Sequence, residues 1–128
     1  MAVLGGLRKA ASSLLIDAAL MSLSNMLIFS IWYWIIDPPG VEEDPHEDAA
    51  WAFLFPQRDG SLPHYDSWSP GYADYLFIGF TTNFAFSPTD ALPLTRTAKM
   101  LMLLQGAVSV VTVTGIAGGA INAIVGNG

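Results

Sequence analysis

Two long stretches without a charged side chain are the strongest constraint on the fold of this chain. The first covers 19 residues from Ala18 to Ile36, and the second covers 26 residues from Met100 to Val125. A helix needs about 20 mainly apolar residues to cross a hydrocarbon layer about 30 Å thick. The sequence therefore predicts two transmembrane helices, which we place at residues 14–36 and 97–125.

The overall composition supports a membrane protein. Hydrophobic residues make up 52% of the 128 residues and charged residues only 12%, about half of the usual fraction in soluble domains. A domain of this length leaves about 30% of its extended-chain surface in contact with solvent, so it cannot hide this much apolar surface in its own core. This composition argues against a disordered chain, a nucleic-acid-binding protein and most soluble enzymes. No nucleophile elbow, phosphate-binding loop or dinucleotide signature is present, so we expect neither an enzyme nor a cofactor.

The residues that flank the first apolar stretch are typical of a membrane boundary. The stretch ends in Trp32, Tyr33 and Trp34, and aromatic side chains of this kind favour the membrane–water interface. Asp37-Pro38-Pro39-Gly40 follows and stops a helix, because proline lacks a backbone donor and clashes with the preceding turn. A secretory signal peptide is the alternative, since Arg8 and Lys9 precede the stretch. The stretch is longer than a typical signal core, and no small-residue cleavage site follows it.

The charged residues are concentrated in the segment between the two predicted spans. Nine of the 11 acidic residues lie between Asp37 and Asp74, together with a single base, Arg58. This segment carries a net charge of −8, whereas the rest of the chain carries +2. We therefore predict that residues 37–71 form an acidic loop, rich in proline and aromatic residues, outside the membrane. The chain has no cysteine, which excludes disulfides and thiolate metal sites.

The densest acidic run, residues 42–48, offers carboxylate oxygens of the kind that bind divalent cations. It lacks the regular spacing of a calcium loop, and such runs are usually solvated. His46 and His64 have no companion ligands at helical spacing. We therefore predict no metal site. The run could instead concentrate cations near a pore mouth.

A shorter apolar and aromatic segment, residues 72–86, lies between the acidic loop and the second span. Its most apolar part runs from Tyr75 to Phe86, which as a helix is only about 18 Å long and cannot cross a bilayer. The segment predicts a re-entrant or interfacial helix, followed by a polar connector at residues 87–95. The expected fold is thus a single all-α integral membrane domain, residues 1–128, with two transmembrane helices around a short helix and an acidic loop.

The end of this short helix and the connector resemble a known pore region. Phe80-Thr81-Thr82 resembles the end of the pore helix in two-transmembrane potassium channels of the pore-loop superfamily, and Asp90, Pro93 and Thr95 match the spacing of the segment that follows the filter. Between Thr82 and Asp90 lie seven residues, where the family has four. The resemblance covers residues 72–125. The chain is also similar to small bacterial membrane proteins that carry an F-S-P-T-D-x-x-P-L-T string.

This resemblance implies a homotetrameric channel in a bacterial inner (plasma) membrane. In such a channel Thr81, Thr82 and Asn83 would line the end of the pore helix, and the mouth would be bordered by Ser87, Thr89 and Asp90. Arg8 and Lys9 flank the first span on one side of the membrane, and Arg96 and Lys99 flank the second span on the other, so the basic residues do not settle the orientation. Of the two orientations, we expect the one with both termini in the cytoplasm.

The chain departs from the family at the ion filter. A potassium filter is a ladder of backbone carbonyls whose glycines allow the required conformations. Here Ser87, Pro88 and Thr89 stand where Gly-Tyr-Gly is expected, and no glycine lies between Asn83 and Thr89. The leading hypothesis is therefore a cation pore without potassium selectivity.

The alternative hypothesis is a non-conducting accessory or structural subunit of a larger membrane complex. In that case Ser87-Pro88-Thr89-Asp90 is only a helix-capping signature, and Thr95 caps the second span. In both hypotheses the partners are the lipid bilayer and other membrane protein chains, with no nucleic acid.

Several polar and small residues within the spans are further candidates. Asp17 would either take a functional role or reach the interface and pair with Arg8 or Lys9. Asn25 is predicted to hold helices together by hydrogen bonding. Gly115 and Gly119 form a GxxxG pair, which predicts close helix packing within the chain or between copies. The remaining candidates are Gly106, predicted to be a packing contact rather than a hinge, and Gln105 and Asn122, predicted to face a polar or protein interior.

Overall fold

The structure is a computed structural model that describes residues 2–38, 51–58, 62–65, 68–85 and 91–126. It contains the two predicted long helices, α1 (Ala2–Ile36) and α3 (Arg96–Gly126), and the short helix between them, α2 (Tyr72–Ala85). Leu4–Ile36 and Arg96–Asn122 are long and apolar enough to cross a membrane. The uncharged stretches therefore predicted the number and order of these helices.

Helix α1 begins about three turns earlier than predicted. Arg8 and Lys9, which precede the predicted span, lie on the helix and are exposed. The residues that precede Leu14 include no proline, and several of them are alanine or leucine, which favour helix. A charge alone does not end a helix, so the boundary of the uncharged stretch was a poor guide to the helix start.

The segment predicted to be an acidic loop contains regular structure. Strand β1 (Phe53–Leu54) is followed by a 3-10 turn, Pro56–Arg58. It pairs antiparallel with β2 (Leu92–Pro93) from the connector, with Phe53 opposite Pro93. The Leu94 amide donates to the Ala52 carbonyl over 2.7 Å. The segment after α1 is thereby joined to the segment before α3.

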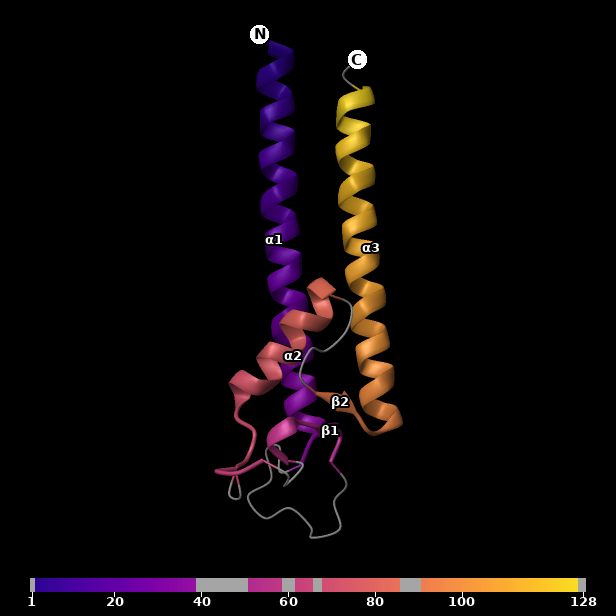
Figure 1. Cartoon of the computed structure of the whole chain (residues 1–128). Coiled ribbons are helices and arrows are strands. Elements are labelled where there is room, and N and C mark those ends of the chain that lie inside the picture. Colours follow the sequence, from indigo (N-terminus) through magenta and orange to yellow (C-terminus); the bar gives the residue numbers. More distant parts are fainter. Residues whose placement is uncertain (1, 39–50, 59–61, 66–67, 86–90, 127–128) are drawn as a thin grey trace.

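Helices α1 and α3 lie side by side and run in opposite directions, so α1 begins where α3 ends (Figure 1). The β1–β2 pair lies at the other end of the molecule. Helix α2 crosses α1 at a slant, and its last turn lies against α3 (Figure 1). A Cβ atom at Gly79 would lie 3.0 Å from the Met26 carbonyl oxygen and 3.3 Å from the Ser30 Cβ. The absence of a side chain at Gly79 thus allows α2 to approach the α1 backbone.

The buried apolar residues gather around β1. Tyr33 of α1 packs edge-on against Phe53, with ring centroids 5.4 Å apart, and Phe55 packs edge-on against Tyr75 at 5.8 Å. Aromatic residues of the predicted outer loop are therefore core residues. The full cluster consists of Phe29, Tyr33, Ala52, Phe53, Phe55, Tyr75, Ile78, Ala91 and Ala98.

Candidate functional site

A buried carboxylate at the end of α1 organises the segment that joins α1 to α2. Asp37 is completely buried, and its carboxylate accepts five hydrogen bonds. The donors are the Ala52 and Phe53 amides at 2.8 and 3.3 Å, Arg58 at 2.9 and 3.0 Å, and the Tyr75 hydroxyl at 2.6 Å. Burial, and then the hydrogen bond to Asp37, raise the pKa of the Tyr75 phenol, so it stays protonated and continues to donate.

Arg58, the partner of Asp37, is also almost completely buried, with 4% of its side chain exposed. Its guanidinium donates to the carbonyls of Phe53 and Pro38 over 3.0 and 2.8 Å. It also lies over the Trp51 ring, 4.8 Å from the ring centroid. The pair is saturated by groups of its own chain, so this cluster holds the loop on the helices and offers no open ligand site.

A second polar cluster joins all three helices. Gln105 of α3 is completely buried. Its amide nitrogen donates to Asn25 Oδ1 of α1 and to the Gly79 carbonyl of α2, both over 2.8 Å. Its amide oxygen accepts from the Tyr33 hydroxyl over 2.5 Å. Asn25, predicted to hold helices together, therefore does so through Gln105. We call Asn25, Tyr33, Gly79 and Gln105 the three-helix junction.

Replacing Gln105 with leucine is expected to destabilise the protein by about 2 kcal/mol. The change leaves the Tyr33 hydroxyl and the Asn25 amide oxygen buried without their partner, and an unsatisfied buried polar group costs about 1 to 3 kcal/mol. The measurement is unfolding of the purified protein in detergent. Asn122→Leu is the matched control, because Asn122 is exposed on the same helix. An equal loss of unfolding free energy in both variants would rule out a stabilising role for the junction.

The residues predicted to line a pore are buried within the single chain. Thr81, Thr82 and Asn83 are 7%, 1% and 4% exposed. The Thr81 hydroxyl donates to carbonyls of its own helix, and the Asn83 carbonyl accepts from Ser109 over 2.7 Å. Within the described ranges, the buried Thr82 hydroxyl has no hydrogen-bond partner. The predicted mouth residues Ser87, Thr89 and Asp90 and the acidic run lie outside the described residues.

The contact between Asn83 and Ser109 places the end of α2 along α3. Ser109 is 13 residues beyond Arg96, where α3 begins, which corresponds to about 20 Å along the helix. Helix α3 is 31 residues long, so α2 ends almost halfway along it. By Leu92 the chain is back at β2, at the end of the molecule where α3 starts (Figure 1).

The small and capping residues of α3 have different surroundings. A Cβ atom at Gly119 would lie 3.4 Å from Leu14 of α1, which is an ordinary packing distance for a close helix pair. A Cβ atom at Gly115 or Gly106 would meet nothing within 4 Å, so neither glycine is a packing contact within this chain. The Thr95 hydroxyl accepts from the Ala98 amide over 3.1 Å and caps α3.

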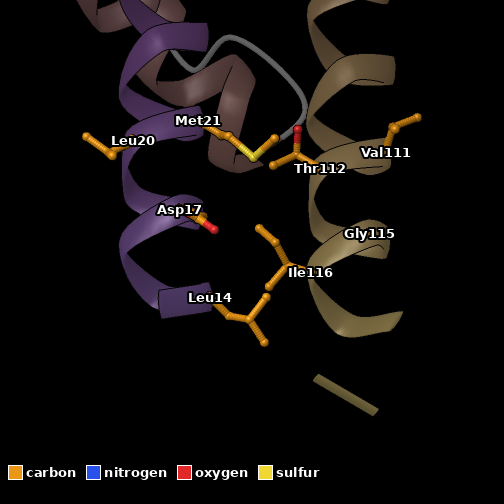
Figure 2. Close-up of a pocket in the computed structure, with 8 residues that line it drawn as sticks. All are labelled: Leu14, Asp17, Leu20, Met21, Val111, Thr112, Gly115 and Ile116. Carbon is orange, nitrogen blue, oxygen red and sulfur yellow. The ribbon is translucent and has the colours of Figure 1, made fainter. Parts of the chain in front are cut away.

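Asp17 lies in a pocket between α1 and α3, which Gly115 also lines (Figure 2). Arg8 and Lys9, the proposed partners of Asp17, are exposed on the same helix. Within the part of the chain that the structure describes, Asp17 forms no ion pair. Its negative charge is therefore not compensated in the way that the sequence suggested.

The most heavily bonded polar residues had only weak sequence signals. Arg58 is the one base in a strongly acidic segment, which is a reason to look for a specific partner. Asp37 directly precedes two prolines and was interpreted as a helix stop. Comparisons with protein-family models, with curated proteins and with solved structures each found no match to this chain.

Proposed function

We propose that the chain is the subunit of a homo-oligomeric membrane pore that passes small cations without potassium selectivity. The supporting observation is the position of α2, which ends almost halfway along α3 while the chain returns to the end where α3 starts. With α1 and α3 spanning the bilayer, the last turn of α2 would lie near the middle of the hydrocarbon layer.

A helix end at that depth needs polar surroundings. The last four carbonyls of a helix have no partner within it, and they carry the negative end of the helix dipole. In α2 the Asn83 carbonyl accepts from Ser109. Irregular backbone at membrane depth is tolerated only where it is buried in protein or lines a water-filled cavity. Copies arranged around a common axis would supply such a cavity, and the converging helix ends would favour cations there.

A non-conducting accessory subunit is the second candidate, and the surface of α2 favours it. The exposed face of the helix carries Phe77, Phe80 and Phe84, which are 46%, 48% and 56% exposed. The hydroxyl and amide side chains of Thr81, Thr82 and Asn83 are instead buried within the chain. A phenylalanine face is better suited to lipid or to another protein than to a water-filled pore.

Ion flux into liposomes containing the purified full-length protein tests the proposal. We expect sodium and potassium to pass at similar rates, well above protein-free vesicles, while chloride stays excluded. Asp90→Asn, which removes a negative charge at the predicted mouth, should lower the preference for cations over chloride several-fold.

The size of the complex separates the two candidates. A pore requires several copies around one axis, and four are expected from the resemblance to the two-transmembrane channels. A monomer or dimer that passes no ions when correctly inserted would reject the pore and favour the accessory subunit.

A further inference from the structure

The pocket between α1 and α3 lies next to the last turn of α2, because Thr112, which lines it, is three residues beyond Ser109, the partner of the Asn83 carbonyl. It has a volume of about 520 Å³, within the range of about 300 to 1,000 Å³ that small-molecule sites occupy. Figure 2 shows side chains of both helices directed into it. These are Leu14, Asp17 and Met21 from α1, and Thr112 and Ile116 from α3, and Gly115 of α3 also lines the pocket.

The two glycines of the GxxxG pair have different surroundings, and Gly115 is the one that lines the pocket. At Gly119 the helices are in contact through Leu14, 3.4 Å from the position of a Cβ atom. One turn earlier, at Gly115, that position is surrounded by open space. A larger residue at Gly115 would occupy part of the gap between Asp17 and α3. The glycine therefore keeps the pocket open.

The polar groups that the described residues contribute to the pocket act as hydrogen-bond acceptors. Among these described lining residues, Asp17 is the one that carries a charge. The Thr112 hydroxyl donates its proton to the Val108 carbonyl over 2.8 Å, which leaves its oxygen as an acceptor. Arg8 and Lys9 are eight or nine residues away on α1, about 12 to 14 Å along the helix. A carboxylate in apolar surroundings favours a positively charged partner.

The depth of Asp17 indicates the shape of that partner. Asp17 is 19 residues before Ile36, or about 28 Å along α1, which is close to the thickness of the hydrocarbon layer. With Trp32 and Trp34 at one membrane interface, Asp17 would lie just inside the other. A charged group could therefore enter from the interface, while the remaining pocket wall is apolar, formed by Leu14, Met21 and Ile116.

We propose that this pocket binds a lipophilic ammonium ion. Its positively charged nitrogen lies against the Asp17 carboxylate and the Thr112 hydroxyl oxygen, and its apolar body fills the space beside Gly115. Binding at this site requires the α1–α3 pair alone. The inference is therefore independent of conduction by the chain.

Equilibrium dialysis of radiolabelled n-octylamine, which is protonated at neutral pH and carries N–H donors, against the full-length protein in an uncharged sugar detergent tests this site. We expect saturable binding of one ion per chain. Asp17→Asn, which removes the charge and keeps the shape, should weaken binding at least about tenfold. Gly115→Leu should abolish binding by filling the pocket. Gly106→Leu is the matched control and should bind normally, because Gly106 also faces open space on α3 but does not line the pocket.

Three results would overturn the site. The first is the absence of saturable binding to the wild-type protein. The second is unchanged binding in both Asp17→Asn and Gly115→Leu, which would place the ion elsewhere. The third is a combination of two observations, in which the wild-type protein does not bind the ion and Gly115→Leu changes the number of chains in the oligomer. That combination would identify a second copy of the chain as the occupant. Helix content of each variant, measured by circular dichroism, distinguishes loss of the site from loss of the fold.

Discussion

Replacing Arg58 with methionine is expected to cost about 3 to 5 kcal/mol of stability, the largest effect of any single substitution considered for this chain. The methionine leaves the Asp37 carboxylate completely buried without its cation. It also removes the donors to the Phe53 and Pro38 carbonyls, which hold the loop against α1. The segment that joins α1 to α2 should therefore detach from the helices.

Unfolding of the purified protein in detergent measures this loss of stability. Two further variants show which interaction is responsible for it. Arg96→Met is the matched control, because Arg96 is exposed at the start of α3 and should change stability by less than about 1 kcal/mol. The double variant Asp37→Asn with Arg58→Met should recover much of the loss, because no unpaired charge then remains buried and the amide oxygen can still accept from the Ala52 amide. A double variant as unstable as Arg58→Met alone would mean that the bonds from Arg58 to the Phe53 and Pro38 carbonyls, rather than the ion pair, carry the stability.

Replacing Gly79 with valine is expected to separate α2 from α1 at a cost of about 3 kcal/mol. A Cβ atom at this position lies 3.0 Å from the Met26 carbonyl oxygen, which belongs to a helix backbone and cannot rotate away. Moving α2 outward would also break the hydrogen bond from Gln105 to the Gly79 carbonyl, and the one between Ser30 and Tyr72.

The same substitution at Gly106 provides the control for Gly79. Gly106→Val makes an equal change in helix propensity on α3, but its Cβ atom meets nothing within 4 Å. It should leave the thermal unfolding of the detergent-solubilised protein nearly unchanged. A similar loss of thermal stability in both variants would mean that valine in a helix causes the effect, and not the contact between α1 and α2.

The sequence alone was sufficient for the helical elements of this fold. A charge-free stretch of 19 residues and another of 26 are local properties, and their lengths predict long helices without any knowledge of neighbours. The short helix was equally readable, because Tyr72–Ala85 is an apolar run that ends before a proline-containing connector. The start of α1 was misplaced for a local reason as well, since a pair of basic residues does not end a helix.

The polar contacts were decided by the tertiary structure. Asp37 and Arg58 are 21 residues apart, and Asn25 and Gln105 are 80 apart, so no local pattern predicts that they meet. An acid before two prolines and a base in an acidic loop are usually solvated, and only the fold shows that both are buried. The β1–β2 pair was also decided by the tertiary structure, because two strands of two residues each have no sequence signal of their own.

The GxxxG pair shows most clearly which properties the sequence determines and which depend on the tertiary structure. Its composition predicted a close approach of helices, and at Gly119 the neighbour is Leu14 of α1. At Gly115 the same residue type leaves a pocket beside Asp17. Composition along a chain determines which segments are apolar enough to become long helices, because that property is summed over neighbouring residues. Which side chains face each other across two helices depends on their rotation and spacing, and these are decided only when all three helices and the loop pack together.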